Sequence, residues 1–133
     1  MLTINDVSLA CLNAVAKQYH VPAVLVLSVL KTENGRNGMS RINTNGTYDL
    51  GVMQVNSVFL SQLKSHGYTL KRLQYSSCEN ITVATWILSK HIANSKASQI
   101  GIGNYHSVTP KLNAVYFNRV KENYKKIVQT IVF

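Results

Sequence analysis

The stretch Ser28–Gly38, SVLKTENGRNG, joins an apolar segment to a polar loop that contains two glycines. Residues 21–30, VPAVLVLSVL, are rich in β-branched side chains and show no clean period. The position of Pro22, at what would be a first helical turn, and the length of the run up to Glu33 favour a buried helix over a strand. The sequence therefore predicts a buried helix that ends at Glu33, one of only five carboxylates in the chain.

A carboxylate in this position has two reasons for a raised pKa. Apolar surroundings penalise the charged form, and so does the negative end of the helix dipole. A carboxyl group that stays protonated near neutral pH can protonate a leaving-group oxygen, as a general acid does. The alternative is that Glu33 points into water at the helix end and pairs with Arg36 or Lys31.

The start of the chain predicts another helix. Thr3 and Asp6 resemble a loose capping box, and Val7, Cys11 and Val15 then repeat every fourth residue. This pattern places Cys11 on the apolar face of a first helix.

Further helices are predicted in three later segments. Ser57 can cap a helix over residues 58–66 that Gly67 ends, and residues 79–95 and 116–131 carry apolar side chains at helical spacing. Residues 34–56 contain four glycines and no regular period, and so long an irregular connection in a compact domain is usually functional or disordered. We predict a mainly α, single-domain fold over residues 1–133 with a long active-site loop.

Composition limits the possible partners. The chain has 133 residues, is 46% hydrophobic and carries a formal net charge of +9, which favours polyanions such as nucleic acid, an anionic membrane or an acidic glycan. It contains no apolar run of about 18 residues that could span a bilayer. The four histidines have no ligand spacing and CxxC is absent, so we expect no metal and no cofactor.

Glycosidases ordinarily use two carboxylates, and the chain offers few. Asp49 lies in the same loop system as Glu33, whereas Asp6, Glu79 and Glu122 belong to predicted helices elsewhere. If the reaction cleaves a glycosidic bond, either Glu33 works with Asp49 or the substrate supplies its own nucleophile.

Five features in a fixed order resemble one known family. The glutamate after an apolar helix is followed by DLGVMQVNS (49–57), CENITVATWIL (78–88), GNYHS (103–107) and YFNRVKENY (116–124). Together they resemble the lytic transglycosylase domain, which has a goose-lysozyme-like fold, over roughly residues 9 to 125. More narrowly, the chain resembles the specialised transglycosylases of conjugation, secretion and type IV pilus machines.

The resemblance implies a role for individual residues. Glu33 would be the sole acid and base in cleavage of peptidoglycan between N-acetylmuramic acid and N-acetylglucosamine, with a 1,6-anhydro ring as product. Gln54 matches a glutamine that binds sugar, and Tyr105 matches a tyrosine whose hydroxyl lies near the catalytic glutamate and the substrate. Asn56 and His106 would also contact the glycan. Met53 would pack beneath the loop, and Gly51 would allow a tight backbone path.

The sequence departs from the family pattern at three positions. Asn34 replaces a common serine, and His106 replaces an asparagine. Asp49 stands where many relatives have alanine, which leaves a lysozyme-like hydrolysis by Glu33 and Asp49 open.

The specialised members also pair a first-helix cysteine with one that precedes Asn-Ile, which implies a Cys11–Cys78 disulfide. Such a bridge fits an oxidising periplasm. The first ten residues lack the features of an export signal, and we expect that a signal peptide was removed.

Two other classes of function stay open. A small basic helical domain could bind DNA, but no predicted helix concentrates the arginine, lysine and asparagine side chains of a recognition helix. A catalytically weak adaptor could bind glycan without cleaving it. We expect peptidoglycan strands as the partner, together with components of an envelope assembly, and no specific nucleic acid.

Overall fold

The computed structural model describes residues 2–131, and the mainly helical prediction is confirmed. The helices are α1 (Leu9–Tyr19), α2 (Ala23–Glu33), α3 (Leu60–Leu63), α4 (Leu70–Tyr75), α5 (Ser77–Ala93), α6 (Ser98–Asn104) and α7 (Pro110–Ile131). The strands are β1 (Thr3–Ile4), β2 (Val7–Ser8), β3 (Ser40–Ile42), β4 (Tyr48–Leu50) and β5 (Val55–Asn56). Two short 3₁₀ segments, η1 (Ser57–Phe59) and η2 (Lys64–His66), flank α3. Among residues 2–131, no helix has both the length and the apolar character needed to cross a bilayer.

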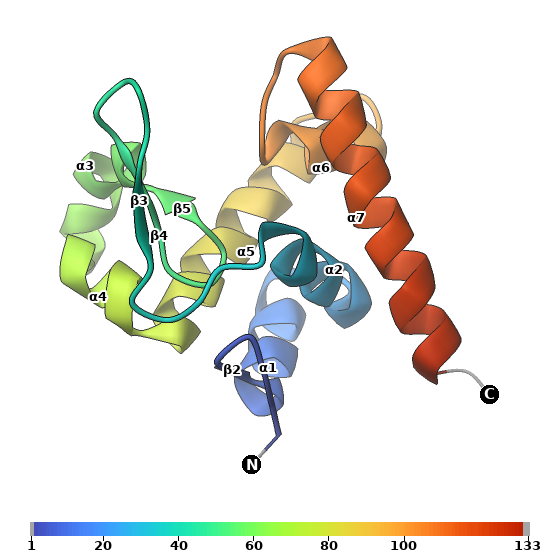
Figure 1. The fold of residues 1–133 in the computed structure, drawn as a ribbon, viewed down its shortest axis with the longest axis horizontal. Helices are drawn as coiled ribbons and strands as arrows, with labels where there is room; N and C mark the ends of the chain where they lie inside the picture. Colours follow the sequence, from blue (N-terminus) through green and yellow to red (C-terminus); the bar gives the residue numbers. More distant parts are fainter. Residues whose placement is uncertain (1, 132–133) are drawn as a thin grey trace.

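The elements form two sides around a central pair of helices (Figure 1). The sheet β3–β4–β5 lies with α3 and α4 on one side, and α6 and α7 lie on the other. Between them run α2 and α5. The end of α2, where Glu33 lies, is thus enclosed by elements from distant parts of the sequence.

Helix α2 is buried, as its sequence predicts. Val26, Val29 and Leu30 have no exposed surface, and the helix packs chiefly against α7. It ends at Glu33 because Asn34 takes a left-handed conformation with φ of 52°. The next residue is Gly35, where an added Cβ would lie 2.3 Å from the Gly51 carbonyl oxygen, so only glycine fits there.

The predicted start of the first helix is wrong. Residues 3–8 form an antiparallel hairpin whose turn residues, Asn5 and Asp6, have φ of 48° and 67°. Asparagine and aspartate tolerate this left-handed turn, which matches the twist of paired strands. Helix α1 therefore begins at Leu9, and its cap is Ser8, not a box formed by Thr3 and Asp6.

The 34–56 segment is more regular than predicted. It contains the sheet in which β4 pairs with both β3 and β5. The strands have two or three residues each, which is too short for a two-residue alternation to stand out in the sequence. The prediction of a long connection without regular structure is wrong in this respect.

Two short helices, α4 and α6, were not predicted. Helix α6 contains Gly101 and Gly103, which disfavour helix but allow close packing here. A Cβ added to Gly101 would lie 2.6 Å from the Ile92 Cα, and one added to Gly103 would lie 2.0 Å from the Asn113 Oδ1. Tertiary packing therefore overrides the local propensity.

The helix after residue 57 is interrupted. It consists of η1, α3 and η2, and Asn56 caps it in place of the predicted Ser57, because the Asn56 side chain accepts a hydrogen bond from the Val58 amide. Gly67 ends it with φ of 84°, as predicted.

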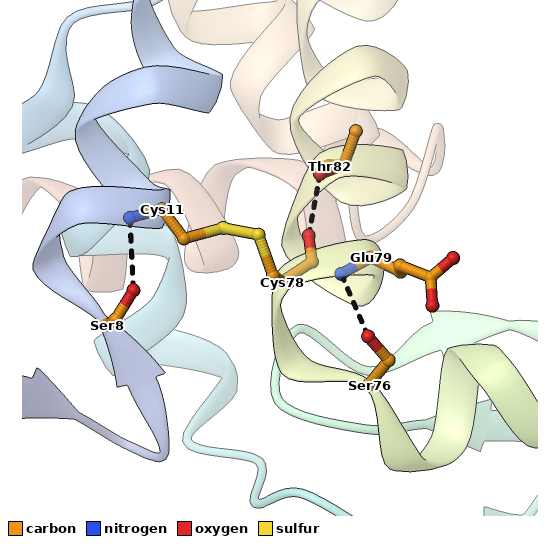
Figure 2. Close-up of a disulfide and its surroundings, with 6 residues drawn as sticks. All are labelled: Ser8, Cys11, Ser76, Cys78, Glu79 and Thr82. Carbon is orange, nitrogen blue, oxygen red and sulfur yellow. Dashed lines mark hydrogen bonds between the residues drawn. A yellow bond between two sulfur atoms is a disulfide. The ribbon is translucent and has the colours of Figure 1, made fainter.

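The disulfide between Cys11 and Cys78 is present and ties α1 to the first turn of α5 (Figure 2). The two Cα atoms lie 5.9 Å apart across a sequence separation of 67 residues. Both flanking helix starts are capped by serines, since Ser8 accepts from the Cys11 amide and Ser76 from the Glu79 amide. The bridge therefore joins two well-defined helix ends.

Candidate active site

A polar cleft of about 520 Å³ lies between helix α7 and the sheet β3–β4–β5, which together with α3 and α4 we call the sheet lobe. All six residues that sequence analysis assigned to catalysis or substrate binding line it, namely Glu33, Asp49, Gln54, Asn56, Tyr105 and His106. Two larger hollows of about 760 and 870 Å³ are lined mostly by apolar side chains and by no carboxylate. Acid–base chemistry therefore belongs to the smaller, polar cleft.

Glu33 is partly buried at the end of α2 and is held by a tyrosine from α7. The Tyr116 hydroxyl donates a hydrogen bond of 2.6 Å to Glu33 Oε2. The pKa of Glu33 is raised from 4.5 to about 7. Burial is the largest cause of the rise and the negative charge of Asp49 adds to it, while the Tyr116 hydrogen bond and the charges of Arg119 and Arg41 oppose it. A carboxyl group with this pKa is divided between its two protonation states near neutral pH.

The alternative in which Glu33 pairs with Arg36 or Lys31 does not hold, since neither forms an ion pair with Glu33 within residues 2–131. Arg36 donates to both carboxylate oxygens of Asp6, at 2.8 and 2.7 Å, and the Asn37 amide donates to Asp6 as well. These contacts lower the pKa of Asp6 to about 2. The turn of the N-terminal hairpin thus fixes the loop that follows Glu33.

Asn34, where the resemblance noted above predicts a serine, also contacts this hairpin. The Asn5 side chain donates to Asn34 Oδ1 at 3.0 Å. Asn34 is therefore used to anchor the loop after α2, and its left-handed backbone suits asparagine better than serine.

Tyr116 is a site residue that sequence analysis missed. No role was assigned to it beyond the apolar stripe of the last helix, and it is indeed 2% exposed. Burial is the main cause, and the charge of Glu33 the second, of a raised pKa of the Tyr116 hydroxyl. The hydroxyl therefore keeps its proton and stays a hydrogen-bond donor. Its presence in the family segment YFNRVKENY was the available signal.

Tyr105 and His106 follow α6 and stack against the Tyr116 ring, with ring centroids 6.4 and 5.1 Å away. The Tyr105 hydroxyl donates to the Met53 carbonyl at 2.9 Å. The hydroxyl that contacts Glu33 is thus that of Tyr116, while Tyr105 connects the cleft wall to the loop at Met53. The exposed His106 ring lies at the mouth of the cleft.

The loop of Gln54 has a tight path. Gly51 has φ of 69°, and an added Cβ would lie 2.4 Å from Asn80 Nδ2, so the predicted role of this glycine is confirmed. Gln54 has φ of 53°, and its side-chain amide donates to the Gly51 carbonyl at 2.9 Å. Met53 is fully buried beneath the loop, as predicted.

Asn80 holds this loop from below and is a second residue that sequence analysis missed. Its fully buried amide group donates to the carbonyls of Leu50 and Leu73, each at 2.8 Å, and accepts from the Met53 amide at 2.9 Å. A buried asparagine with these bonds is costly to replace. Its sequence signals were its polar side chain on a largely apolar helix and its place in the segment CENITVATWIL (78–88).

Asp49 shares the cleft with Glu33 but is engaged by its neighbours. Asn56 donates to Asp49 Oδ1 at 3.1 Å, and an Arg41 nitrogen lies 3.9 Å from Asp49 Oδ2. Arg41 and Asp49 face each other across β3 and β4. Asn56 is therefore both a cap of η1 and a support for Asp49.

Comparison with known proteins identifies the family. The model of the transglycosylase SLT domain matches residues 10–127. The chain is 29% identical over 132 residues to the invasion protein IagB of Salmonella typhimurium, an alignment that covers 96% of this chain and 82% of the relative. It is 23% identical over 121 residues to the protein IpgF of Shigella flexneri, with 90% and 80% covered. Because the family match includes the whole cleft and most of the chain, this protein belongs to the transglycosylase SLT family.

Proposed function

We propose that this protein is a peptidoglycan lytic transglycosylase in which Glu33 is the only catalytic acid and base. The observation that carries the proposal is the state of Glu33, which lies in a polar cleft, accepts a hydrogen bond from Tyr116 and has a pKa of about 7. Such a group can give a proton in one step and accept it in the next.

In the first step the protonated Glu33 donates its proton to the glycosidic oxygen between N-acetylmuramic acid and N-acetylglucosamine. The bond from the muramyl C1 to that oxygen breaks, and its electron pair stays on the oxygen. The leaving sugar departs with a 4-hydroxyl group. Positive charge develops at C1, and the carboxylate left at position 33 lies beside it.

In the second step the muramyl 6-hydroxyl attacks C1. A bond from O6 to C1 closes the 1,6-anhydro ring, and the hydroxyl proton passes to Glu33. The acid is thereby restored and no water is consumed. This route needs no second carboxylate, because the nucleophile belongs to the sugar.

The other cleft residues have supporting roles in this proposal. Tyr116 fixes the carboxyl group of Glu33, and its hydrogen bond stabilises the charged form during the second step. Gln54 and His106, which line the cleft, would contact sugar hydroxyl and acetamido groups. Tyr105 holds the Met53 carbonyl and so keeps the loop of Gln54 in place.

A lysozyme-like hydrolysis is the second candidate, because Asp49 lines the same cleft and its charge raises the pKa of Glu33. There Asp49 would act as base or nucleophile and water would add to C1. Asp49 already accepts from Asn56 and faces Arg41, which favours a supporting role.

The two mechanisms predict different products for the wild type and different activities for the Asp49→Asn variant. Mass spectrometry of digested cell walls should find anhydro-muramyl ends for the wild type. Glu33→Gln should lower turnover by about 10²- to 10⁴-fold or more, whereas Asp49→Asn should keep partial activity. Reducing muramyl ends, together with complete loss of turnover in Asp49→Asn, would establish hydrolysis instead.

We further propose that the enzyme works in the periplasm and opens the cell wall locally for an envelope-spanning machine of the secretion, conjugation or pilus type. The disulfide and the similarity to a protein named for invasion support this context. A turbidity assay on purified cell walls tests activity directly. Binding to cell walls without clearing would indicate a glycan-binding adaptor, and binding to duplex DNA that weakens with salt would indicate a nucleic-acid module.

A further inference from the structure

Two guanidinium groups line the cleft from opposite sides. Arg41 comes from β3 in the sheet lobe, and Arg119 comes from α7. The carboxylates that line the same cleft are Glu33 and Asp49. Glu33 accepts a hydrogen bond from Tyr116 and Asp49 accepts one from Asn56. In the described part of the chain, the ion pair that either arginine makes is the long contact of Arg41 with Asp49.

Arg41 is exposed and weakly engaged. Its side chain is 70% exposed, and its nearest carboxylate oxygen, on Asp49, lies 3.9 Å away. At this distance the contact is not a hydrogen bond. The N–H groups of its planar guanidinium are therefore available to hydrogen-bond a group that enters the cleft.

Arg119 is exposed and anchored at one nitrogen. It follows Tyr116 by one helical turn and donates to the Thr32 carbonyl at 3.3 Å. That bond satisfies a main-chain carbonyl in the last turn of α2 and places the guanidinium beside Glu33. The remaining N–H groups make no hydrogen bond with residues 2–131 in the structure.

We propose that Arg41 and Arg119 form a binding site for carboxylates of the substrate, on the two sides of the cleft. The inference rests on the proposed function, because it assumes that a peptidoglycan strand occupies the cleft. Arginine binds carboxylates with paired, charge-assisted hydrogen bonds. A neutral glycan offers no such group, so the two arginines select glycan that bears carboxylates.

Peptidoglycan can supply this carboxylate from two sources. Intact strands carry stem peptides with several carboxylates, while the lactyl group of the muramyl sugar is held in an amide. When an amidase removes the peptides, the lactyl carboxylate becomes free. Glycan with and without peptides therefore separates the two sources, and chitin oligosaccharides serve as a neutral glycan.

Binding is measured in the Glu33→Gln protein. Under the proposed mechanism this variant does not cleave the glycan, and because it has no carboxylate at position 33, the arginine variants cannot act through the protonation of Glu33. We expect this protein to bind a carboxylate-bearing glycan, of either source, more tightly than chitin oligosaccharides of equal length. Arg41→Gln and Arg119→Gln should each weaken binding of the carboxylate-bearing glycan about two- to fivefold. They should leave the binding of chitin oligosaccharides unchanged, and the difference should shrink as salt is added.

Matched variants separate this role from simpler ones. Glutamine at 119 keeps a donor for the Thr32 carbonyl, and Arg119→Lys keeps the charge and should restore part of the preference. Lys111→Gln removes one positive charge from an exposed position on the same helix, outside the cleft, and should change no affinity. If the arginine variants lose affinity only for the glycan without peptides, the arginines bind the lactyl carboxylate. If they lose affinity only for the peptide-bearing glycan, they bind a carboxylate of the stem peptide.

The inference is overturned if the arginine variants weaken binding of all three glycans equally, or of none. It is also overturned if Lys111→Gln has the same effect, because the preference would then come from net charge. Failure of the proposed function has a different signature, in which the wild-type protein leaves cell walls intact or Glu33→Gln cleaves them normally.

Discussion

Replacing Glu33 with glutamine should stabilise the folded protein at alkaline pH while it removes activity. The pKa of Glu33 is raised to about 7 from an ordinary value of 4.5, chiefly by burial. A difference of this size corresponds to about 3 kcal/mol of unfavourable free energy for the charged carboxylate in the folded state. Glutamine has nearly the same shape and can still accept the hydrogen bond from Tyr116, but it carries no charge.

The sign of the effect follows from the protons bound in each state. Between pH 4.5 and about 7 the folded protein keeps the Glu33 proton and the unfolded chain releases it. The free energy of unfolding contributed by this group therefore falls as pH rises through that window. Below pH 4.5 both states are protonated, and the wild type and Glu33→Gln should be about equally stable. Above pH 7 the variant should be more stable by up to about 3 kcal/mol.

Urea unfolding followed by helical circular dichroism at pH 4, 6 and 8, with the disulfide intact, measures this difference. Glu122→Gln is the matched control, since Glu122 lies on α7 with its side chain 64% exposed, and its stability difference should change little with pH. If the stability difference between Glu33→Gln and the wild type stayed constant from pH 4 to 8, the pKa of Glu33 could not be raised in the folded protein, and the reasoning would be refuted. The same protein should fail to clear cell walls.

Three further predictions concern the tyrosines and the disulfide. Tyr116→Phe removes a hydrogen bond that favours charged Glu33, so the alkaline limb of the pH–rate profile should move to higher pH and turnover should fall about tenfold or more. Tyr105→Phe should cost about 1–3 kcal/mol in urea unfolding, because a buried main-chain carbonyl loses its donor, and an unchanged unfolding midpoint would contradict this. Replacing Cys11 and Cys78 with alanine should lower the free energy of unfolding by about 4 kcal/mol.

The parts of the fold predicted correctly are those with a strong local pattern. The continuous apolar run before Glu33 could hardly be exposed, and it forms the buried helix α2. The repeating apolar residues of 79–95 and 116–131 belong to α5 and α7. Gly67 has the left-handed conformation expected at a helix end. In each case the local sequence and the tertiary structure favour the same conformation.

The errors occurred where tertiary contacts decide. The Asn5–Asp6 turn resembled part of a helix cap, yet the residues that stabilise it, Asn34, Arg36 and Asn37, lie about thirty positions away. Strands of two or three residues carry no period. Helix α6 forms despite Gly101 because the close packing on α5 needs a residue without a Cβ.

The candidate site shows the same division. The motifs indicated Glu33 and five other residues that line its cleft, because acids, amides and loop glycines differ visibly from a helical pattern. Tyr116 and Asn80 were missed because each occupies a position that an apolar residue could fill. The Tyr116 hydroxyl bonds Glu33, 83 residues away, and the Asn80 side chain bonds main-chain groups of Leu50, Met53 and Leu73. A single sequence gives no measure of such pairings.

The acidity of Glu33 results from opposing effects that no single segment could supply. Burial by the surrounding helices and the charge of Asp49 raise its pKa, while Tyr116, Arg119 and Arg41 lower it. Without the hydrogen bond and the two cations the pKa would be higher, and without burial it would be lower. The balancing groups come from α7 and β3, on the two sides of the cleft. The carboxyl group therefore acquires a pKa suited to both steps of the proposed reaction only when both sides of the fold have closed around α2.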